Sequence, residues 1–233
     1  MRITKKLCRP QAHWNKTWGR FAIMAPRLCR QIRASCLRKI QMDEQLVSKL
    51  NQIWDEAKVN SPLNQKSAVC VSTIDSAGFP QSRFVDLKEI GPSGFTFCTS
   101  YNSEKGNHLS NNPKISLLAW WDHIGYQIRV IGSAVRISSE LADKFWLTRS
   151  KEAQVATTCF KQSEIWDSEI SMENHFSSAL TATEESISRP SYWGGYSVAP
   201  HAIEVLKFKT NRVHTREQYL WEETSWKMRL LQP

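Results

Sequence analysis

Two arginines and a histidine occupy alternate positions near the end of the chain, at Arg212, His214 and Arg216. Residues two apart in an extended strand project from one face, so a strand here would place two guanidinium groups beside one imidazole. All three side chains donate hydrogen bonds, and both arginines are always charged. Such a cluster is tolerated in water or around an anion. The pattern therefore predicts either a solvated basic edge strand or a site for a phosphorylated or acidic small molecule.

A second pair of cations lies in the alternating run 81–90. In a regular strand, Arg83 and Lys88 are an odd number of residues apart and project from opposite faces. Both side chains can therefore contact one ligand only if the strand twists or ends near Lys88.

Residues 99–106 lead from the end of a predicted strand into the start of a predicted helix. Backbone N–H groups at such a junction, together with Ser103 and Lys105, suit a phosphate, whereas the negative charge of Glu104 opposes one. An ordinary capped helix explains the same residues. Elsewhere, Gln127 and the pair Gln162-Ser163 add amide and hydroxyl groups that suit a planar polar ring.

The order of predicted elements favours a mainly β fold with peripheral helices (α+β), built as an antiparallel barrel. There is no βαβ repetition and no GxGxxG loop, which argues against a dinucleotide-binding domain. Alternation and turn residues predict strands at 67–74, 81–90, 95–99, 114–121, 126–137, 201–209, 212–221 and 226–231. Apolar spacing and capping residues predict helices at 43–59, 103–111, 138–149 and 163–180.

The net charge of +9 belongs to a tail, residues 1–41, which hold eleven Lys and Arg and no acidic residue. The other 192 residues carry 20 basic and 22 acidic side chains. The tail fits an organellar transit peptide, a basic arm for nucleic acid or anionic lipid, or a segment upstream of a true start at Met42. No apolar run approaches the roughly 20 residues that span a bilayer. We expect a cytoplasmic protein, or an organellar one if the tail is a transit peptide, with no nucleic-acid or membrane partner.

The cysteine pattern argues against a metal site. Three of the six cysteines lie in the tail, and the others are Cys70, Cys98 and Cys159. No CxxC motif or Cys/His cluster with zinc-like spacing is present. We therefore expect no bound metal and a reducing compartment.

Taken together, residues 42–233 resemble the pyridoxamine 5′-phosphate oxidase family, whose members are FMN-dependent split-barrel enzymes. Each motif is short, and their order and spacing carry the resemblance. They are Arg83-Phe-Val-Asp-Leu-Lys88, Phe95-Thr-Phe-Cys-Thr99, Ser103-Glu-Lys105, Asn111-Asn-Pro113, Gln127-Ile-Arg-Val-Ile-Gly132, Lys161-Gln-Ser163, Ser191-Tyr-Trp-Gly-Gly-Tyr196, Arg212-Val-His-Thr-Arg216 and Arg229-Leu-Leu-Gln-Pro233.

The resemblance implies one FMN-binding split β-barrel domain, Greek-key-like, that works as a homodimer with each flavin between subunits. It implies that Lys88 and Arg149 hold the phosphate of a vitamin B6 substrate. It places Arg212 and His214 over the substrate ring as the catalytic residues. The residues that it implies for FMN binding are Arg83, Lys88, Cys98, Thr99, Lys105, Gln127, Gln162, Ser163 and Arg216.

The implied reaction is the oxidation of pyridoxamine or pyridoxine 5′-phosphate to pyridoxal 5′-phosphate, with O2 as acceptor and H2O2 as product. Two alternatives share the fold: a flavin oxidoreductase for another acidic ring compound, as in the phenazine pathway, and a non-catalytic protein that binds flavin or B6 phosphate. A third alternative is a nucleic-acid or lipid binder that depends on the tail.

Five residues depart from the family pattern. Glu104 stands in place of an Arg at the FMN phosphate, and Leu206 in place of a Trp near the flavin; both changes should weaken FMN binding. Phe145 and Ala153 replace a Tyr and a Ser at the substrate phosphate. Each of these removes a hydroxyl donor worth about 1 kcal/mol. Thr215 replaces an Asp between the last two residues of the cluster.

Overall fold

The computed structural model describes residues 40–59, 61–183 and 187–233. The hypotheses about the basic tail fall almost entirely on residues 1–39, which lie outside this described part. Met42 is buried, and its backbone N–H donates to Pro92 O, so the body of the fold includes this residue. No helix in the described ranges is long and apolar enough to cross a membrane.

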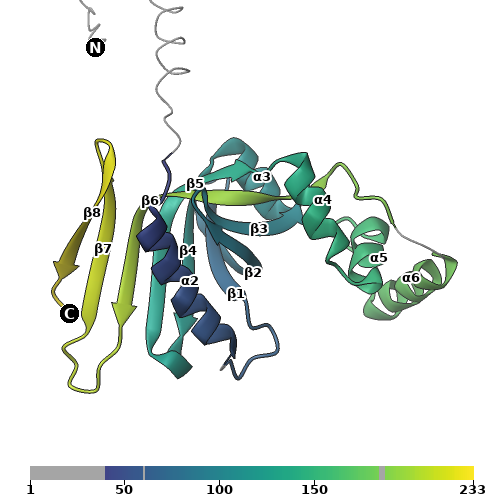
Figure 1. The fold of residues 1–233 in the computed structure, drawn as a ribbon. Helices are drawn as coiled ribbons and strands as arrows, with labels where there is room; N and C mark the ends of the chain where they lie inside the picture. Colours follow the sequence, from purple (N-terminus) through teal and green to yellow (C-terminus); the bar gives the residue numbers. More distant parts are fainter. Residues whose placement is uncertain (1–39, 60, 184–186) are drawn as a thin grey trace, which may run out of the picture. The chain divides into compact units, whose positions relative to one another are not determined.

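Six antiparallel strands form a closed barrel, and two more extend its sheet (Figure 1). The strand order is β3-β2-β1-β4-β5-β6-β7-β8, and an additional pairing of β3 with β6 closes the barrel. The order β3-β2-β1-β4 is that of a Greek key. The prediction of a mainly β barrel with peripheral helices is confirmed. The strands are β1 (Ala68–Ile74), β2 (Pro80–Gly91), β3 (Gly94–Ser100), β4 (Lys114–Trp121), β5 (Tyr126–Arg136), β6 (Trp193–Lys207), β7 (Thr215–Glu222) and β8 (Ser225–Leu231).

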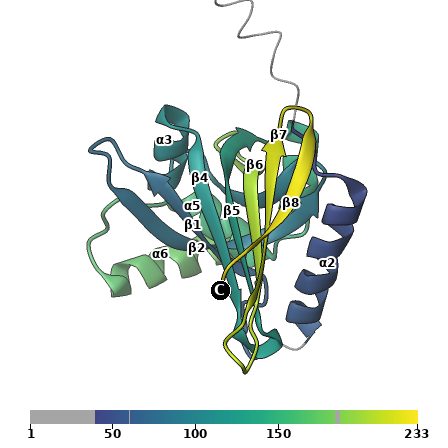
Figure 2. The ribbon, with the colours of Figure 1, turned by 90° about the vertical axis from the view of Figure 1, so that its left-hand side faces the viewer.

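Strand β6 divides its pairing between the barrel and the extension. Residues 193–198 pair with β3, whereas residues 202–207 pair with β7. A register shift in its pairing with β5, between Ile131 and Gly132, marks the bend between these halves. A Cβ on Gly132 would lie 2.2 Å from Ala199 O, so only glycine permits this close approach. As a result β7 and β8 extend the sheet beyond the barrel as a hairpin (Figure 2).

The helices lie outside the barrel strands. Helix α2 lies along one side, and α4, α5 and α6 lie together on the opposite side (Figure 1). The amphipathic spacing predicted for the first helix is confirmed, because the five residues of its apolar face are buried: Leu46, Leu50, Ile53, Trp54 and Ala57. The helices are α2 (Glu44–Val59), α3 (Glu104–Asn111), α4 (Ser139–Leu147), α5 (Lys151–Cys159) and α6 (Glu169–Ala182), with a 3-10 turn η1 (Asp122–Ile124).

Two predicted helix boundaries between residues 138 and 180 are wrong. The first helix ends at Leu147 rather than near Arg149, and Ser150 then caps a separate helix, α5, by accepting from the N–H of Ala153. The second predicted helix begins at Glu169 instead of Ser163, after the N-cap Ser168. The serines start new helices because their hydroxyls satisfy N–H groups that a continuous helix would pair internally.

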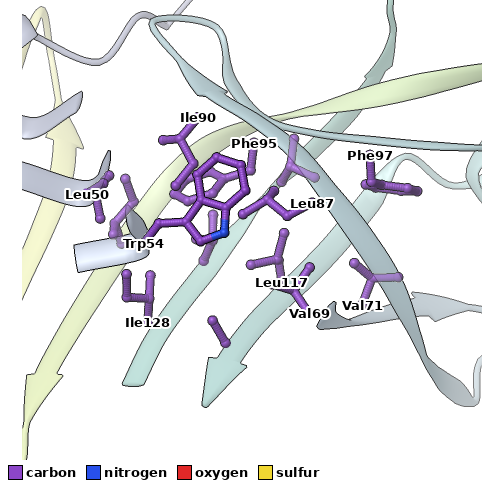
Figure 3. Close-up of a cluster of buried hydrophobic side chains, with 14 of the residues drawn as sticks. Leu50, Trp54, Val69, Val71, Leu87, Ile90, Phe95, Phe97, Leu117 and Ile128 are labelled. Atoms are coloured by element: carbon purple, nitrogen blue, oxygen red, sulfur yellow. The ribbon is translucent and has the colours of Figure 1, made fainter. Parts of the chain in front are cut away.

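The core fills the barrel and the interface with α2 (Figure 3). Leu50 and Trp54 of α2 pack over Val69 and Leu117 of the barrel, and Phe97 is fully buried. Burial of each such side chain contributes about 1.5–3 kcal/mol relative to exposure. The barrel is thus the rigid frame on which the polar residues near its strand ends are fixed.

The predicted strand 212–221 begins later than expected, which contradicts the single-face arrangement of its three basic residues. Strand β7 starts at Thr215, so Arg212 and His214 lie in the preceding loop. Arg212 has a φ of 66°, a left-handed conformation that no regular strand contains. His214 Nδ1 accepts from the backbone N–H of Lys209, which closes the loop at 3.0 Å. Of the three basic residues, Arg216 alone lies in a strand.

Candidate functional site

A cavity of about 360 Å3 lies between the barrel and the helices on the α5 side. Strands β2 and β3 form one wall, and helices α3 and α5 contribute to the others. Five residues that the sequence analysis selected line this cavity: Cys98, Thr99, Lys105, Arg149 and Gln162. Its other lining residues are Phe84, Val85, Ser100, Ala156, Thr157, Phe160 and Trp193.

Lys105 is a buried cation at one end of this cavity. Its side chain is 7% exposed, and its Nζ donates to Thr99 Oγ1 at 3.2 Å and to Ser103 Oγ at 3.4 Å. Burial lowers the pKa of Lys105, the neighbouring Arg83 lowers it further, and Glu104 raises it. A buried ammonium group whose hydrogen-bond partners are hydroxyls retains capacity for an anion.

Arg83 reaches the same place from β2. Its Nη1 donates to Thr73 Oγ1 and to Gln81 O, both at 2.6 Å, and its Nη2 lies 3.5 Å from Glu104 Oε2. Ser163 also approaches this place, since its Oγ accepts from the backbone N–H of Glu104 at 3.3 Å. We call Arg83, Thr99, Ser103, Lys105 and Ser163 the anion cradle.

Arg149 is a second cation of the cavity, and its side chain is half-buried. Its Nη2 donates to Ala153 O at 2.7 Å and to Thr157 Oγ1 at 2.9 Å, while its buried Nε has no partner among the described residues. The guanidinium lies 5.0 Å from the ring centroid of Trp193 and 5.6 Å from that of Trp146. Burial lowers the pKa of Arg149. The two indoles hold a guanidinium that has no carboxylate partner, which suits a second anion.

Strand β2 is irregular at Lys88. The register with β3 shifts between Leu87 and Glu89, so Lys88 lies in a bulge that interrupts the regular alternation. Its Nζ pairs with Asp86 Oδ2 at 2.6 Å. Burial raises the pKa of Cys98 to about 12, against the opposing effects of Lys88 and Arg149. Both cations are therefore close to Cys98, which remains a protonated thiol at neutral pH.

The remaining predicted residues form a separate group on strands β5, β6 and β7 and in the loop before β7. Gln127 of β5 is paired with Leu206 of β6, which is paired in turn with Arg216 of β7, so the three are cross-strand neighbours in one row. Arg212 and His214 follow in the loop before β7. We call Gln127, Leu206, Arg212, His214 and Arg216 the C-terminal row. None of these five lines the cavity within one copy of the chain.

Sequence reasoning missed several residues of the two groups. Thr157 and Phe160 were missed because α5 was not predicted, although Thr157 lies one helical turn after Ala153 on the same face. Trp193 was part of a quoted motif but had no assigned role. Glu204 is 5% exposed and binds Arg216, and its only signal was a carboxylate inside an otherwise apolar strand.

Comparison with protein families gives two matches that together cover most of the described body. Residues 55–178 match the family described as pyridoxamine 5′-phosphate oxidase. Residues 193–233 match the pyridoxine 5′-phosphate oxidase C-terminal dimerisation region.

Curated relatives and solved structures agree with these matches. The chain is 33% identical to a pyridoxine/pyridoxamine 5′-phosphate oxidase of Haemophilus influenzae over 82% of this chain and 90% of that one. It is 35% identical to the enzyme of the same name from Teredinibacter turnerae, over 78% and 86%. Its fold is similar to PhzG of Burkholderia lata 383 in complex with tetrahydrophenazine-1-carboxylic acid, with a TM-score of 0.73, 28% identity and coverage of 79% and 91%. An FMN-binding protein of Nostoc punctiforme shares the fold at a TM-score of 0.65 and 14% identity, over 79% and 96%.

Proposed function

Because the chain belongs to the pyridoxamine 5′-phosphate oxidase family, we propose that it is an FMN-dependent oxidase of a vitamin B6 phosphate. It converts pyridoxamine or pyridoxine 5′-phosphate to pyridoxal 5′-phosphate, with O2 as electron acceptor and H2O2 as the second product. One observation carries the proposal: a single cavity is lined by two separate cations, the buried Lys105 and the half-buried Arg149, and neither has a carboxylate ion-pair partner in the described ranges. A phosphorylated cofactor and a phosphorylated substrate would supply the two missing anions.

The donor set of the cavity fits FMN. The anion cradle offers two cations and the hydroxyls of Thr99 and Ser163 to a phosphate, while the buried Ser103 hydroxyl donates to Ser100 O and accepts from Lys105. Gln162 offers an amide for the polar edge of a flavin ring, and Phe84, Phe160 and Trp193 offer aromatic surface. When bound, FMN supplies the hydride-accepting chemistry and returns electrons to O2. The residues of the chain bind and orient the two ligands.

We assign the substrate phosphate to Arg149 and Lys88. Phe145 and Ala153 offer no hydroxyl donors to this phosphate, but the two charged donors remain. Arg149 is held by Ala153 O and Thr157 Oγ1, so its orientation is set before the substrate arrives. Cys98, with its raised pKa of about 12, takes no part as a nucleophile. Positioning of this kind can lower a barrier by several kcal/mol.

We assign the C-terminal row to the site of a second copy of the chain. The row lies outside the cavity of its own copy, and residues 193–233 match a dimerisation region. Apolar side chains on β4, β5 and β8 are exposed, which supports an extensive interface: Trp120 is 58%, Ile131 50% and Leu230 68% exposed. In the homodimer, Gln127 and Arg216 contact FMN, while Arg212 and His214 lie over the substrate ring as the catalytic residues.

We assign the oxidase to residues 42–233 and give the basic tail no part in the chemistry. Removal of residues 1–41 should leave flavin binding and turnover unchanged. It would abolish a function as a nucleic-acid or lipid binder, because that function depends on the tail.

A second candidate substrate is another acidic ring compound. The absence of hydroxyls at Phe145 and Ala153 favours it, since a guanidinium such as Arg149 binds a carboxylate as readily as a phosphate. The structure of PhzG, whose fold this chain shares, contains tetrahydrophenazine-1-carboxylic acid.

The test is to purify the full chain, load it with FMN and supply each substrate class under air. Pyridoxal 5′-phosphate and H2O2 formed in equal amounts from the B6 phosphates would support the first proposal. Oxidation of a reduced phenazine carboxylate alone would support the second. Flavin-loaded protein that oxidises neither would indicate a non-catalytic binding protein.

A further inference from the structure

We propose that Glu104 is a built-in counter-ion of the anion cradle, which competes with the phosphate of the flavin and lowers the preference of the site for FMN over unphosphorylated riboflavin. The inference rests on the proposed flavin site and concerns its selectivity. It makes Glu104 a specificity-determining residue.

The position of Glu104 carries the first step. It is the first residue of α3 and the direct neighbour of Lys105, and its Oε2 lies 3.5 Å from Arg83 Nη2. The Glu104 side chain is 59% exposed, whereas that of Arg83 is 19% exposed. The carboxylate therefore lies at the mouth of the cradle, on the solvent side of the guanidinium.

The charges of the cradle carry the second step. Burial is the main cause of the lowered pKa of Lys105; repulsion by Arg83 lowers this pKa further, and Glu104 raises it. With Glu104 present, the three side chains have a net charge of +1; without its carboxylate, they have a net charge of +2. Glu104 thus stabilises the ligand-free protein, in which the two cations are otherwise crowded without an anion.

A phosphate reverses the sign of this contribution. A dianionic phosphate in the cradle replaces the Glu104 carboxylate as the partner of Arg83. The carboxylate then repels the phosphate. Riboflavin has the same ring but no phosphate, so Glu104 leaves its affinity nearly unchanged. The effects of Glu104 on FMN affinity and on ligand-free stability therefore have opposite signs, which a merely structural residue would not produce.

The experiment compares the full-length wild type with Glu104→Gln, both freed of flavin. The dissociation constants of FMN and riboflavin are measured by quenching of flavin fluorescence, and the Tm is measured without ligand. We expect the Kd for FMN to fall by about two- to fivefold, within the range of partly exposed charge pairs, while the Kd for riboflavin changes by less than about twofold. The Tm of the ligand-free variant should fall. The gain for FMN should shrink in high salt.

Glu169→Gln is the matched control. Glu169 is also the first residue of a helix, α6, after a serine N-cap, and it is exposed. It should change neither Kd, which separates the effect of the cradle from that of any helix N-terminal carboxylate. Equal changes for FMN and riboflavin in Glu104→Gln, or weaker FMN binding, would overturn the inference while leaving the flavin site intact. If neither flavin binds the wild type or the variant, the proposed flavin site is refuted together with the inference.

Discussion

Glu204 holds Arg216 across strands β6 and β7 through two hydrogen bonds to one carboxylate oxygen. Nε and Nη2 of Arg216 lie 3.0 and 2.9 Å from Glu204 Oε1. The other oxygen, Oε2, accepts from Arg129 Nη2 at 2.7 Å. The carboxylate is 5% exposed and satisfied on both sides, so it fixes the direction of the Arg216 guanidinium. Glu204 is therefore a positioning residue for the arginine that we assign to FMN in the neighbouring copy.

Replacing Glu204 by Gln should weaken FMN binding, although we assign this residue no contact with the flavin. The amide keeps the shape but loses the charge that orients Arg216, and a partly buried ion pair is broken. We expect a loss of about 1–3 kcal/mol in the free energy of unfolding and a higher Kd for FMN, measured by chemical denaturation and by flavin fluorescence. Arg129→Gln is the control, because it breaks the other ion pair of Glu204 but leaves the hydrogen bonds to Arg216. Equal FMN affinity in wild type and Glu204→Gln would contradict the positioning role.

Arg212→Ala and His214→Ala should impair turnover more than they impair FMN retention. Both residues lie in the loop before β7 and are assigned to the substrate ring rather than to the cofactor. The comparison is kcat at saturating FMN against the Kd for FMN. Because Arg212 has a φ of 66°, Arg212→Gly is the unstrained companion variant and should show the same loss of turnover. The reverse pattern, loss of flavin with normal turnover, would show that the loop has been assigned to the wrong ligand.

Arg149→Ala should raise the KM for the phosphorylated substrate by about tenfold to a hundredfold, because a charge-assisted hydrogen bond is lost. The Kd for FMN should remain close to the wild-type value, since the cofactor phosphate is assigned to the cradle. Thr157→Val removes the hydroxyl that accepts from Arg149 Nη2 and should give a smaller increase in KM. Steady-state kinetics and flavin titration separate the two ligands. A parallel loss of FMN affinity in Arg149→Ala would show that Arg149 binds the cofactor, which contradicts its assignment to the substrate phosphate.

The affinity for FMN should decline at high pH, starting below the ordinary lysine pKa of 10.5. Burial lowers the pKa of Lys105 in the ligand-free protein, so the folded state releases this proton before the unfolded chain does. Between the two pKa values the unfolded chain binds more protons, and the contribution of Lys105 to the free energy of unfolding rises with pH. Loss of the cation weakens phosphate binding over the same range. Lys105→Met should remove this pH dependence, whereas an unchanged profile in that variant would exclude Lys105 as its source.

The barrel was predictable because its signals are local. Alternating burial marks β1 and β4, and the spacing of Leu46, Leu50 and Ile53 marks α2. Helix α5 was missed because Val155 is its only buried residue, so it has no apolar stripe. The error at Arg212 and His214 has a different cause. Alternating cations indicate a strand only if the backbone of that segment pairs with a neighbouring strand. The loop that contains Arg212 and His214 instead forms hydrogen bonds within itself.

Five residues selected from the sequence line the cavity, whereas the geometry of the candidate site was less predictable. The anion chemistry of Arg83, Lys105 and Arg149 follows from residue types and motifs. The bulge at Lys88 depends on pairing with β3, which no local pattern of β2 reveals. The role of Glu204 also depends on strand pairing, because Arg129 and Arg216 come from the two strands that flank it.

The central claim is that the cavity of one copy and the C-terminal row of another form each site, and subunit complementation tests it most directly. Lys105→Ala disables the cavity and Arg216→Ala disables the row, so each variant alone should be nearly inactive. Mixed by co-expression in equal amounts, half of the dimers combine both variants and contain one intact site. The mixture should recover about one quarter of the wild-type turnover per subunit, as random pairing in a two-fold dimer requires. No recovery, with mixed dimers verified by mass spectrometry, would show that both groups of residues serve the same copy and would contradict the account.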